Sequence, residues 1–128
     1  MSAKSKGTNG EREVIRSFWS LGWVAMRAAG SGSTHYPCPD IIAGKLGKRI
    51  VVECKVTAEK RKYFTIDEIN QLVYFASHFG AEPFVAVKFP QKSWFFFTIE
   101  DLKKTENSYI IASEDCEIKG ITIEHLTE

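Results

Sequence analysis

The chain has 128 residues, of which 44% are hydrophobic and 26% are charged, and its formal net charge is +1. These values predict one compact domain, spanning 1–128 with residues 1–7 flexible, and exclude a disordered or fibrous chain. No apolar stretch reaches the roughly 20 residues that span a bilayer, and the first residues lack a signal peptide's apolar core. Three cysteines without CxxC spacing indicate free thiols. We therefore expect a cytoplasmic protein with no membrane partner.

The charge is distributed unevenly along the chain. Residues 1–62 contain twelve Lys and Arg against five acidic residues, a net charge of +7, and the remainder carries −6. Such an asymmetry predicts a basic face set against an acidic one, and a basic face is typical of proteins that bind a polyanion such as nucleic acid.

The first half of the chain begins with a helical pattern. Thr8 and Glu11 have the spacing of a capping box, apolar residues follow at helical spacing, and the pattern stops at Gly22. Residues 23–28 have strand composition, and residues 30–39 form a loop rich in Gly, Ser and Pro. The next two strand-like runs are "DIIAG" and "KRIVVECKV". Because they flank Leu46 and Gly47, they predict a β-hairpin.

The second half repeats this pattern. Thr65 and Glu68 predict a capped second helix that ends at Gly80. Strand-like runs follow at "PFVAVKF" and "SWFFFTI", then a short polar helix near 99–105 and a strand near 108–112. The order predicts an α/β fold with a central mixed β-sheet flanked by helices. Both faces of "SWFFFTI" require burial, either inside the chain or against another copy.

The run "IVVECKV" carries Glu53 and Lys55 on one face, because side chains alternate along a strand. If Leu46 and Gly47 form the turn, Asp40 lies directly opposite Glu53, with Cβ atoms about 4.5–5.5 Å apart. The two carboxylates would repel each other, and a divalent cation would remove this repulsion. Oxygen ligands alone favour Mg²⁺ or Mn²⁺ over zinc. A register shifted by one residue would put the two acids on opposite faces.

Two further residues lie near this pair in the predicted fold. Glu11 is on the apolar, sheet-facing side of the first helix, so it is either a third carboxylate of the metal site or the capping partner of Thr8. Lys55 predicts an ammonium that orients or deprotonates an attacking water, or stabilises charge on a phosphate. A lysine that turns to solvent at the strand end is the alternative.

The stretch "PDIIAGKLGKRIVVECK" resembles the PD-(D/E)xK motif of the restriction-endonuclease-like nuclease superfamily. In the same order along residues 6–90, "KGTNGEREVIRSFWSLGWVAMRAAGSGS", "PDIIA", "VVECKV" and "FGAEPFVAVKFP" resemble archaeal Holliday junction resolvases. The resemblance implies a restriction-endonuclease-like core (αβββαβ). It implies an endonuclease of recombination and repair that works as a homodimer on four-way junction DNA. Paired symmetric Mg²⁺-dependent nicks would leave a 5′-phosphate and a 3′-hydroxyl.

The resemblance also implies roles for individual residues. The implied metal ligands are Glu11, Asp40 and Glu53. The implied catalytic residues are these three acids, the lysine of the motif and a serine of the "GSGS" loop, that is Glu11, Asp40, Glu53, Lys55 and Ser31. The predicted DNA contacts are Arg12, Arg27, Lys6 and Ser33. Either Ser31 or Ser33 could be the functional loop serine.

Other residues are expected to have structural roles. Glu68 should cap the second helix with Thr65, Cys54 should face away from Glu53 as a core thiol, and Lys88 needs no function.

Two other functions compete with junction resolution. One is another PD-(D/E)xK nuclease of repair or restriction, acting on linear, flapped or modified DNA. The other is a catalytically inactive DNA-binding subunit. The lack of a recognisable base-reading module favours the junction over other DNA. Clustered acids disfavour a pure DNA binder, because phosphate binding needs basic groups.

Overall fold

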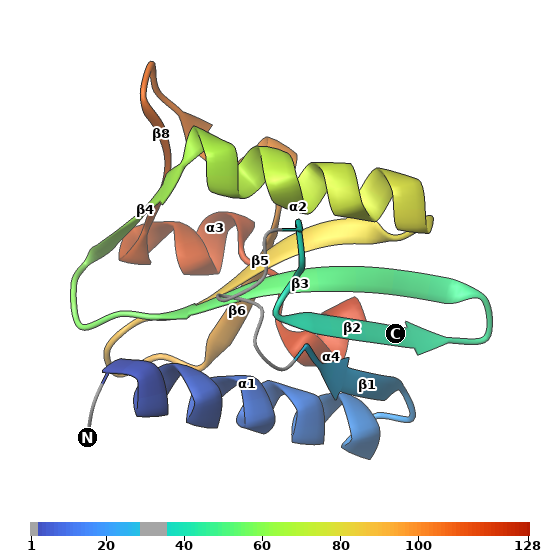
Figure 1. Ribbon diagram of the computed structural model, residues 1–128. Helices are drawn as coiled ribbons and strands as arrows, with labels where there is room; N and C mark the ends of the chain where they lie inside the picture. Colours follow the sequence, from blue (N-terminus) through green and yellow to red (C-terminus); the bar gives the residue numbers. More distant parts are fainter. Residues whose placement is uncertain (1–2, 29–35) are drawn as a thin grey trace.

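The computed structural model of the chain describes residues 3–28 and 36–128, with side chains from residue 7 onward (Figure 1). The helices and strands, in chain order, are α1 (Ala3–Ser20), β1 (Val24–Arg27), β2 (Ile41–Lys45), β3 (Lys48–Val56), β4 (Arg61–Thr65), α2 (Ile66–Phe79), β5 (Glu82–Lys88), β6 (Trp94–Thr98), β7 (Lys103–Lys104), β8 (Ser108–Ala112), α3 (Cys116–Lys119) and α4 (Ile123–Leu126). No helix in these two ranges is long and apolar enough to cross a membrane.

The strands form a five-stranded sheet in the order β1-β2-β3-β5-β6 and a three-stranded sheet in the order β4-β8-β7. In the larger sheet β3 and β5 run parallel, whereas the other neighbours are antiparallel. The predicted fold class, a mixed central sheet flanked by helices, is therefore confirmed. Figure 1 shows α1 along one face of this sheet and α2 along the other.

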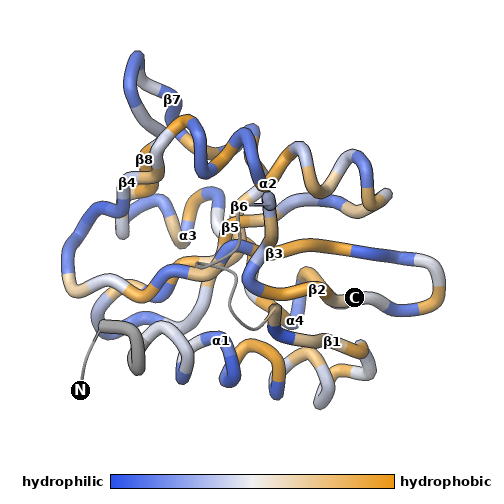
Figure 2. Tube along the Cα trace, in the orientation of Figure 1, coloured by the Kyte–Doolittle hydropathy of each residue, from blue (hydrophilic) through white to orange (hydrophobic). Residues whose placement is uncertain are grey.

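Each face of the sheet has its own hydrophobic layer. Phe18 of α1 packs in a layer that includes Val52 and Cys54 of β3, and Ile69 of α2 packs in the layer that includes Val51. Figure 2 shows these strand interiors as hydrophobic. The side chains of β3 alternate between the two layers, so Cys54 is a buried core thiol on the α1 side, as predicted. Glu53 and Lys55 lie on the α2 side, like Val51.

The hairpin of β2 and β3 has the predicted turn. Leu46 and Gly47 both have positive φ, 48° and 89°, as a two-residue type I′ turn requires. Glycine adopts this conformation without steric cost. Ile41 pairs with Val52, which is the register that the sequence predicts. The position opposite the residue before Ile41 is therefore Glu53.

Helix α2 also forms as predicted. Thr65 Oγ1 accepts a hydrogen bond from the backbone N of Glu68 at 3.0 Å, and Glu68 Oε1 accepts one from the backbone N of Thr65 at 3.3 Å. Gly80 ends the helix in the left-handed conformation. The capping box and the glycine satisfy backbone groups that would otherwise lack partners at the two ends.

Three predictions about the elements are wrong. Helix α1 begins at Ala3, so Thr8 lies inside the helix and does not cap it. The sequence pattern also missed β4, which has one buried residue, Phe64, and pairs with β8 from a distant part of the chain. The expected helix near 99–105 is a single 3₁₀ turn, Ile99–Asp101, followed by β7. Local periodicity is weak in such short segments, and tertiary pairing decides their structure.

The aromatic strand β6 is buried inside the chain on both faces. Phe96 packs in the α1 layer and Phe97 in the α2 layer. The outer edge of β6 is partly covered too, since Phe96 and Ile121 exchange two backbone hydrogen bonds of 2.8 Å. The packing of this chain therefore accounts for the run, without a contact to another copy.

Helix α1 approaches the sheet closely at Gly10. A Cβ atom there would lie 2.9 Å from both Trp94 Cζ2 and Val56 Cγ2, whereas a Cβ at Gly7 would have no neighbour within 4 Å. We predict that Gly10→Ala lowers the free energy of unfolding by about 1–3 kcal/mol through overpacking. Gly7→Ala in the same helix should raise it by about 0.4–1 kcal/mol. Urea unfolding followed by circular dichroism measures both, and equal shifts would contradict the close approach.

Candidate active site

Asp40 and Glu53 lie together at the open end of the β2–β3 hairpin. The backbone N of Asp40 donates to the carbonyl of Val52 at 3.1 Å, so the residue before β2 still lies against β3. Asp40 Oδ2 accepts a hydrogen bond of 2.9 Å from the backbone N of Cys54. The carboxyl of Asp40 is thereby held against β3 beside Glu53. The two acids therefore lie side by side, as the hairpin predicts, and their role stays a prediction.

Glu53 has an unusual protonation equilibrium. Its side chain is 19% exposed. Burial first, and then the charge of Asp40, raise the pKa of Glu53 to about 8, and a hydrogen bond with Asp40 acts in the same direction, while Lys55 opposes the shift. At neutral pH Glu53 is therefore largely protonated. A divalent cation would replace this proton and remove the repulsion, so the donor set fits Mg²⁺ or Mn²⁺.

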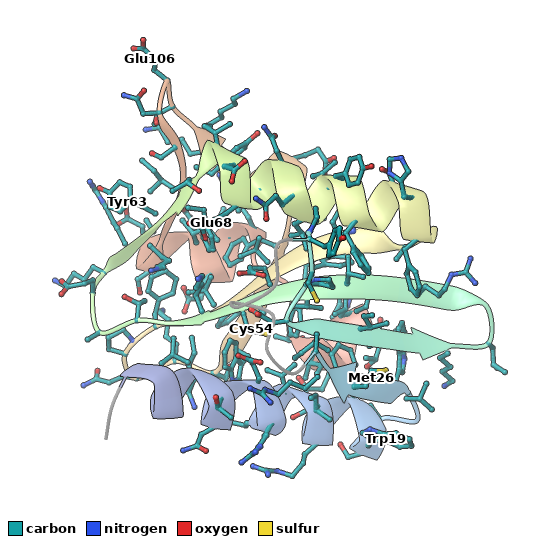
Figure 3. The ribbon with its side chains drawn as sticks, in the orientation of Figure 1. Trp19, Met26, Cys54, Tyr63, Glu68 and Glu106 are labelled. Atoms are coloured by element: carbon teal, nitrogen blue, oxygen red, sulfur yellow. The ribbon has the colours of Figure 1, made fainter. Side chains whose placement is uncertain are left out.

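Lys55 links the hairpin to α2. Its Nζ lies 3.8 Å from Glu53 Oε2 and 3.8 Å from Glu68 Oε2. Figure 3 places Glu68 at the first turn of α2 and Cys54 on β3 beneath it. One carboxylate oxygen of Glu68 caps α2 and the other faces Lys55. From the local sequence Glu68 is expected only to cap α2, and its contact with Lys55 is not, because β3 and α2 meet only in the folded chain.

Glu11 approaches the site from α1. Its Oε1 accepts a hydrogen bond of 3.0 Å from Arg27 Nε, in a salt bridge whose Glu11 side chain is 15% exposed. Arg27 Nη2 also donates to Thr8 Oγ1 at 3.5 Å. Burial first and then the charge of Asp40 raise the pKa of Glu11, against the opposing charge of Arg27. Glu11 therefore does not cap α1; its carboxylate lies in the field of Asp40 and is held by Arg27.

The three acids do not surround one point in this conformation. Within residues 3–28 and 36–128, no three His, Cys, Asp or Glu side chains are close enough together to hold a metal ion. Asp40 and Glu53 are in place for a cation, whereas the Oε1 atom of Glu11 is bonded to Arg27.

The other predicted site residues are placed as follows. Arg12 is exposed on α1, and Lys88 forms a salt bridge of 3.2 Å with Glu13. Ser31 and Ser33 lie outside the described residues, as does the side chain of Lys6. The loop serine and these DNA contacts therefore stay predictions.

The family model described as archaeal Holliday junction resolvase (hjc) matches residues 2–128. A crossover junction endodeoxyribonuclease Hjc from Archaeoglobus fulgidus is 45% identical over 84% of this chain and 79% of its own length. The protein of that name from Methanocaldococcus jannaschii is 32% identical over 93% of this chain and 83% of its own length.

The fold agrees with these sequence similarities. The crystal structure of A. fulgidus Hjc, a Holliday junction resolvase from an archaeal hyperthermophile, superimposes with a TM-score of 0.88 and 38% identity, and the match covers 95% of this chain and 100% of that one. The chain belongs to the archaeal Holliday junction resolvase family.

The raised pKa of Glu53 predicts a pH-dependent stability. The folded protein retains the proton that an unfolded Glu, with a pKa near 4.5, has lost, so stability should fall as the pH rises from about 4.5 through about 8. We expect the melting temperature of the metal-free protein to fall over this pH range. Glu53→Gln should lose most of this pH dependence, and at about pH 8 it should be more stable than the unmodified protein.

The control for this measurement is Glu106→Gln, which removes an exposed carboxylate from the turn before β8 (Figure 3). It should keep the profile of the unmodified protein. Mg²⁺ should raise the melting temperature of the unmodified protein at about pH 8 more than that of Glu53→Gln. Parallel profiles for the unmodified protein and Glu53→Gln would show that Glu53 is ionised throughout.

Proposed function

We propose that this chain resolves four-way DNA junctions by paired symmetric nicks that require Mg²⁺ and leave a 5′-phosphate and a 3′-hydroxyl. Its family makes it a crossover junction endodeoxyribonuclease. The observation that carries the mechanism is the pair of Asp40 and Glu53 at the hairpin end, with Lys55 Nζ 3.8 Å from Glu53. Two adjacent acids and an amine are the groups that hydrolysis of a phosphodiester needs.

Asp40 and Glu53 would hold the cation, with Glu11 as a third ligand once its carboxylate is free of Arg27. Bound there, Mg²⁺ would supply Lewis-acid activation of water and neutralise charge on the phosphate and the leaving 3′ oxygen. Asp40 keeps its orientation through the hydrogen bond from the backbone of Cys54. The site is thus aligned by the backbone of β3 before any ligand arrives.

Lys55 supplies the positive charge next to this site. Its ammonium lies between Glu53 and Glu68, and these two contacts limit its movement. From this position Lys55 can donate a hydrogen bond to a phosphate oxygen or to the attacking water. When Arg27 leaves Glu11, its guanidinium becomes available for a phosphate of the same DNA.

The alternative functions fit these contacts less well. A catalytically inactive DNA-binding subunit would have no use for the clustered acids Asp40, Glu53 and Glu68, because phosphate binding needs basic groups. Another nuclease of the superfamily, acting on linear, flapped or modified DNA, would have the same residues at its site. Only the choice of DNA substrate separates it from a resolvase.

Symmetric cutting requires two sites, and we propose that a homodimer provides them. The C-terminal half of α2 carries two stacked ring pairs, Tyr74 with His78 at 4.2 Å and Phe75 with Phe79 at 5.5 Å between centroids. We call these four side chains the aromatic face of α2. Tyr74 is 57% exposed and Phe79 is 45% exposed. Exposed aromatic side chains are typical of protein interfaces, so this face is where a second copy would dock.

The cleavage prediction compares a synthetic four-way junction with a linear duplex of the same sequence. The unmodified protein with Mg²⁺ should make paired nicks in the junction alone, and EDTA should abolish them. Glu53→Ala should bind the junction without cutting it, and Lys55→Ala should cut about 10²–10⁴-fold more slowly. Glu82→Ala, which removes an exposed acid at the start of β5, should cut normally.

Two outcomes would contradict this proposal. Equal cutting of the linear duplex would make the protein a general nuclease. Binding of the junction without cutting in either Mg²⁺ or Mn²⁺ would make it an inactive DNA-binding subunit.

The dimer prediction concerns Phe79. Phe79→Glu should produce a monomer in sedimentation velocity, because it buries a charge in the interface. Its nicks on the two junction strands should become uncoupled. Met26→Glu introduces the same charge at an exposed apolar residue of β1, 62% exposed, and should remain dimeric. A dimeric Phe79→Glu together with a monomeric Met26→Glu would place the interface at β1 instead.

A further inference from the structure

A second basic site lies where β3 passes into β4. A depression of about 470 Å³ is lined there by Thr57, Glu59, Lys60, Arg61, Lys62 and Tyr63. We call this feature the basic groove. It holds three cations against one carboxylate, and Figure 2 shows the start of β4 as hydrophilic. The sequence analysis predicted no role for any of these residues.

The cations of the basic groove lack acidic partners within the protein. Among residues 7–28 and 36–128, Lys60, Arg61 and Lys62 take part in none of the salt bridges, whereas Arg27, Lys55, Lys88 and Lys92 each have an acidic partner. Lys60 and Arg61 are exposed and Lys62 is half-buried. Three adjacent unpaired cations repel one another, and an external anion would remove that repulsion.

The backbone of the basic groove has a defined conformation. The backbone N of Thr57 donates to the carbonyl of Lys88 at 3.1 Å, and the carbonyl of Lys60 accepts from the backbone N of Ser113 at 2.8 Å. Arg61 pairs with Ala112 in the β4–β8 ladder. The cations are therefore carried by a backbone that is hydrogen-bonded to β5 and β8. Binding of a ligand would not require this backbone to become ordered.

The basic groove follows the candidate active site along the chain. Thr57 follows the last residue of β3, the strand that carries Glu53 and Lys55. Lys62 lies on the same side of β4 as Phe64, whose ring packs in the α2 layer, and Lys55 lies on that same side of β3. Seven residues separate Lys55 from Lys62, so the two Cα atoms are at most about 25 Å apart.

We propose that the basic groove binds the sugar-phosphate backbone of one junction arm beside the cut. A DNA strand rises about 3.4 Å per nucleotide, so the contact falls within roughly seven nucleotides of the scissile phosphate. Contacts of this kind fix the register of the duplex without reading its sequence. The assignment rests on the proposed function, because it takes the DNA at Lys55 to be the DNA in the basic groove.

The test measures binding of the full-length protein to a synthetic four-way junction in EDTA by fluorescence anisotropy, as a function of salt. The logarithm of the binding constant falls linearly with the logarithm of the salt concentration, with a slope of about −0.9 for each phosphate contact. Lys60→Ala/Lys62→Ala should weaken binding and reduce this slope by nearly 2. Lys60→Ala alone, in the loop before β4, should reduce the slope by about 0.9. This single variant replaces the double variant if the double change disturbs β4.

The matched control is Lys45→Ala/Lys48→Ala, which removes the same charge from two exposed lysines at the opposite end of β3. It should leave the slope unchanged, and Lys60→Arg/Lys62→Arg should keep the slope of the unmodified protein. A normal slope for Lys60→Ala/Lys62→Ala, or an equal loss in the control, would overturn the assignment. Since the slope is measured without cleavage, it separates this inference from the proposed function, which fails if the unmodified protein does not cut junctions with Mg²⁺.

Discussion

The structure of the site depends on the register of one hairpin. The turn at Leu46 and Gly47 makes Asp40 the cross-strand neighbour of Glu53, and a shift by one residue would move one acid to the other face of the sheet. The arrangement is electrostatically costly, because two carboxyls share a mostly buried position and one of them holds a proton near neutral pH. Such a cost is typical of functional sites, where repulsion between protein groups becomes affinity for a cation.

The two helices complete the site from opposite faces of the sheet. From α1, Glu11 reaches toward Asp40 and is held by Arg27 of β1. From α2, Glu68 holds Lys55 with one carboxylate oxygen while the other caps its own helix. The contact at Glu68 ties the start of α2 to β3, so the orientation of the helix and that of the lysine depend on each other. By contrast, the salt bridge between Glu11 and Arg27 occupies two groups that the proposed function needs elsewhere. Under the proposed function, this pair is therefore the element of the site that would change when metal and DNA bind.

The positive charge of the molecule is organised around the same strand. Lys55 lies within the site with its charge balanced by acids, and the basic groove beyond the end of β3 holds cations that have no such balance. A paired cation contributes to chemistry because its position is fixed, whereas unpaired surface cations contribute to affinity by releasing counterions from DNA. This distribution accounts for the basic first half of the chain. In the proposed function, it also assigns catalysis and duplex positioning to successive parts of β3 and β4, and the aromatic face of α2 to the contact with a second copy.

The sequence by itself determined the features that depend on residues close together in the chain. The hairpin register, the caps of α2 and the pairing of Asp40 with Glu53 follow from turn chemistry and the two-residue period of a strand. The tertiary structure decided the partners of side chains that can reach several groups. Glu11 meets Arg27 instead of capping its helix, and Glu68 meets Lys55, because the sheet brings α1, β1, β3 and α2 together across long chain separations. Likewise β4 forms because β8 pairs with it, and β6 is buried because the hydrophobic layers on both faces of the sheet pack against it. Local periodicity does not indicate contacts between residues far apart in the sequence. Such contacts stabilise the chain only once it has folded.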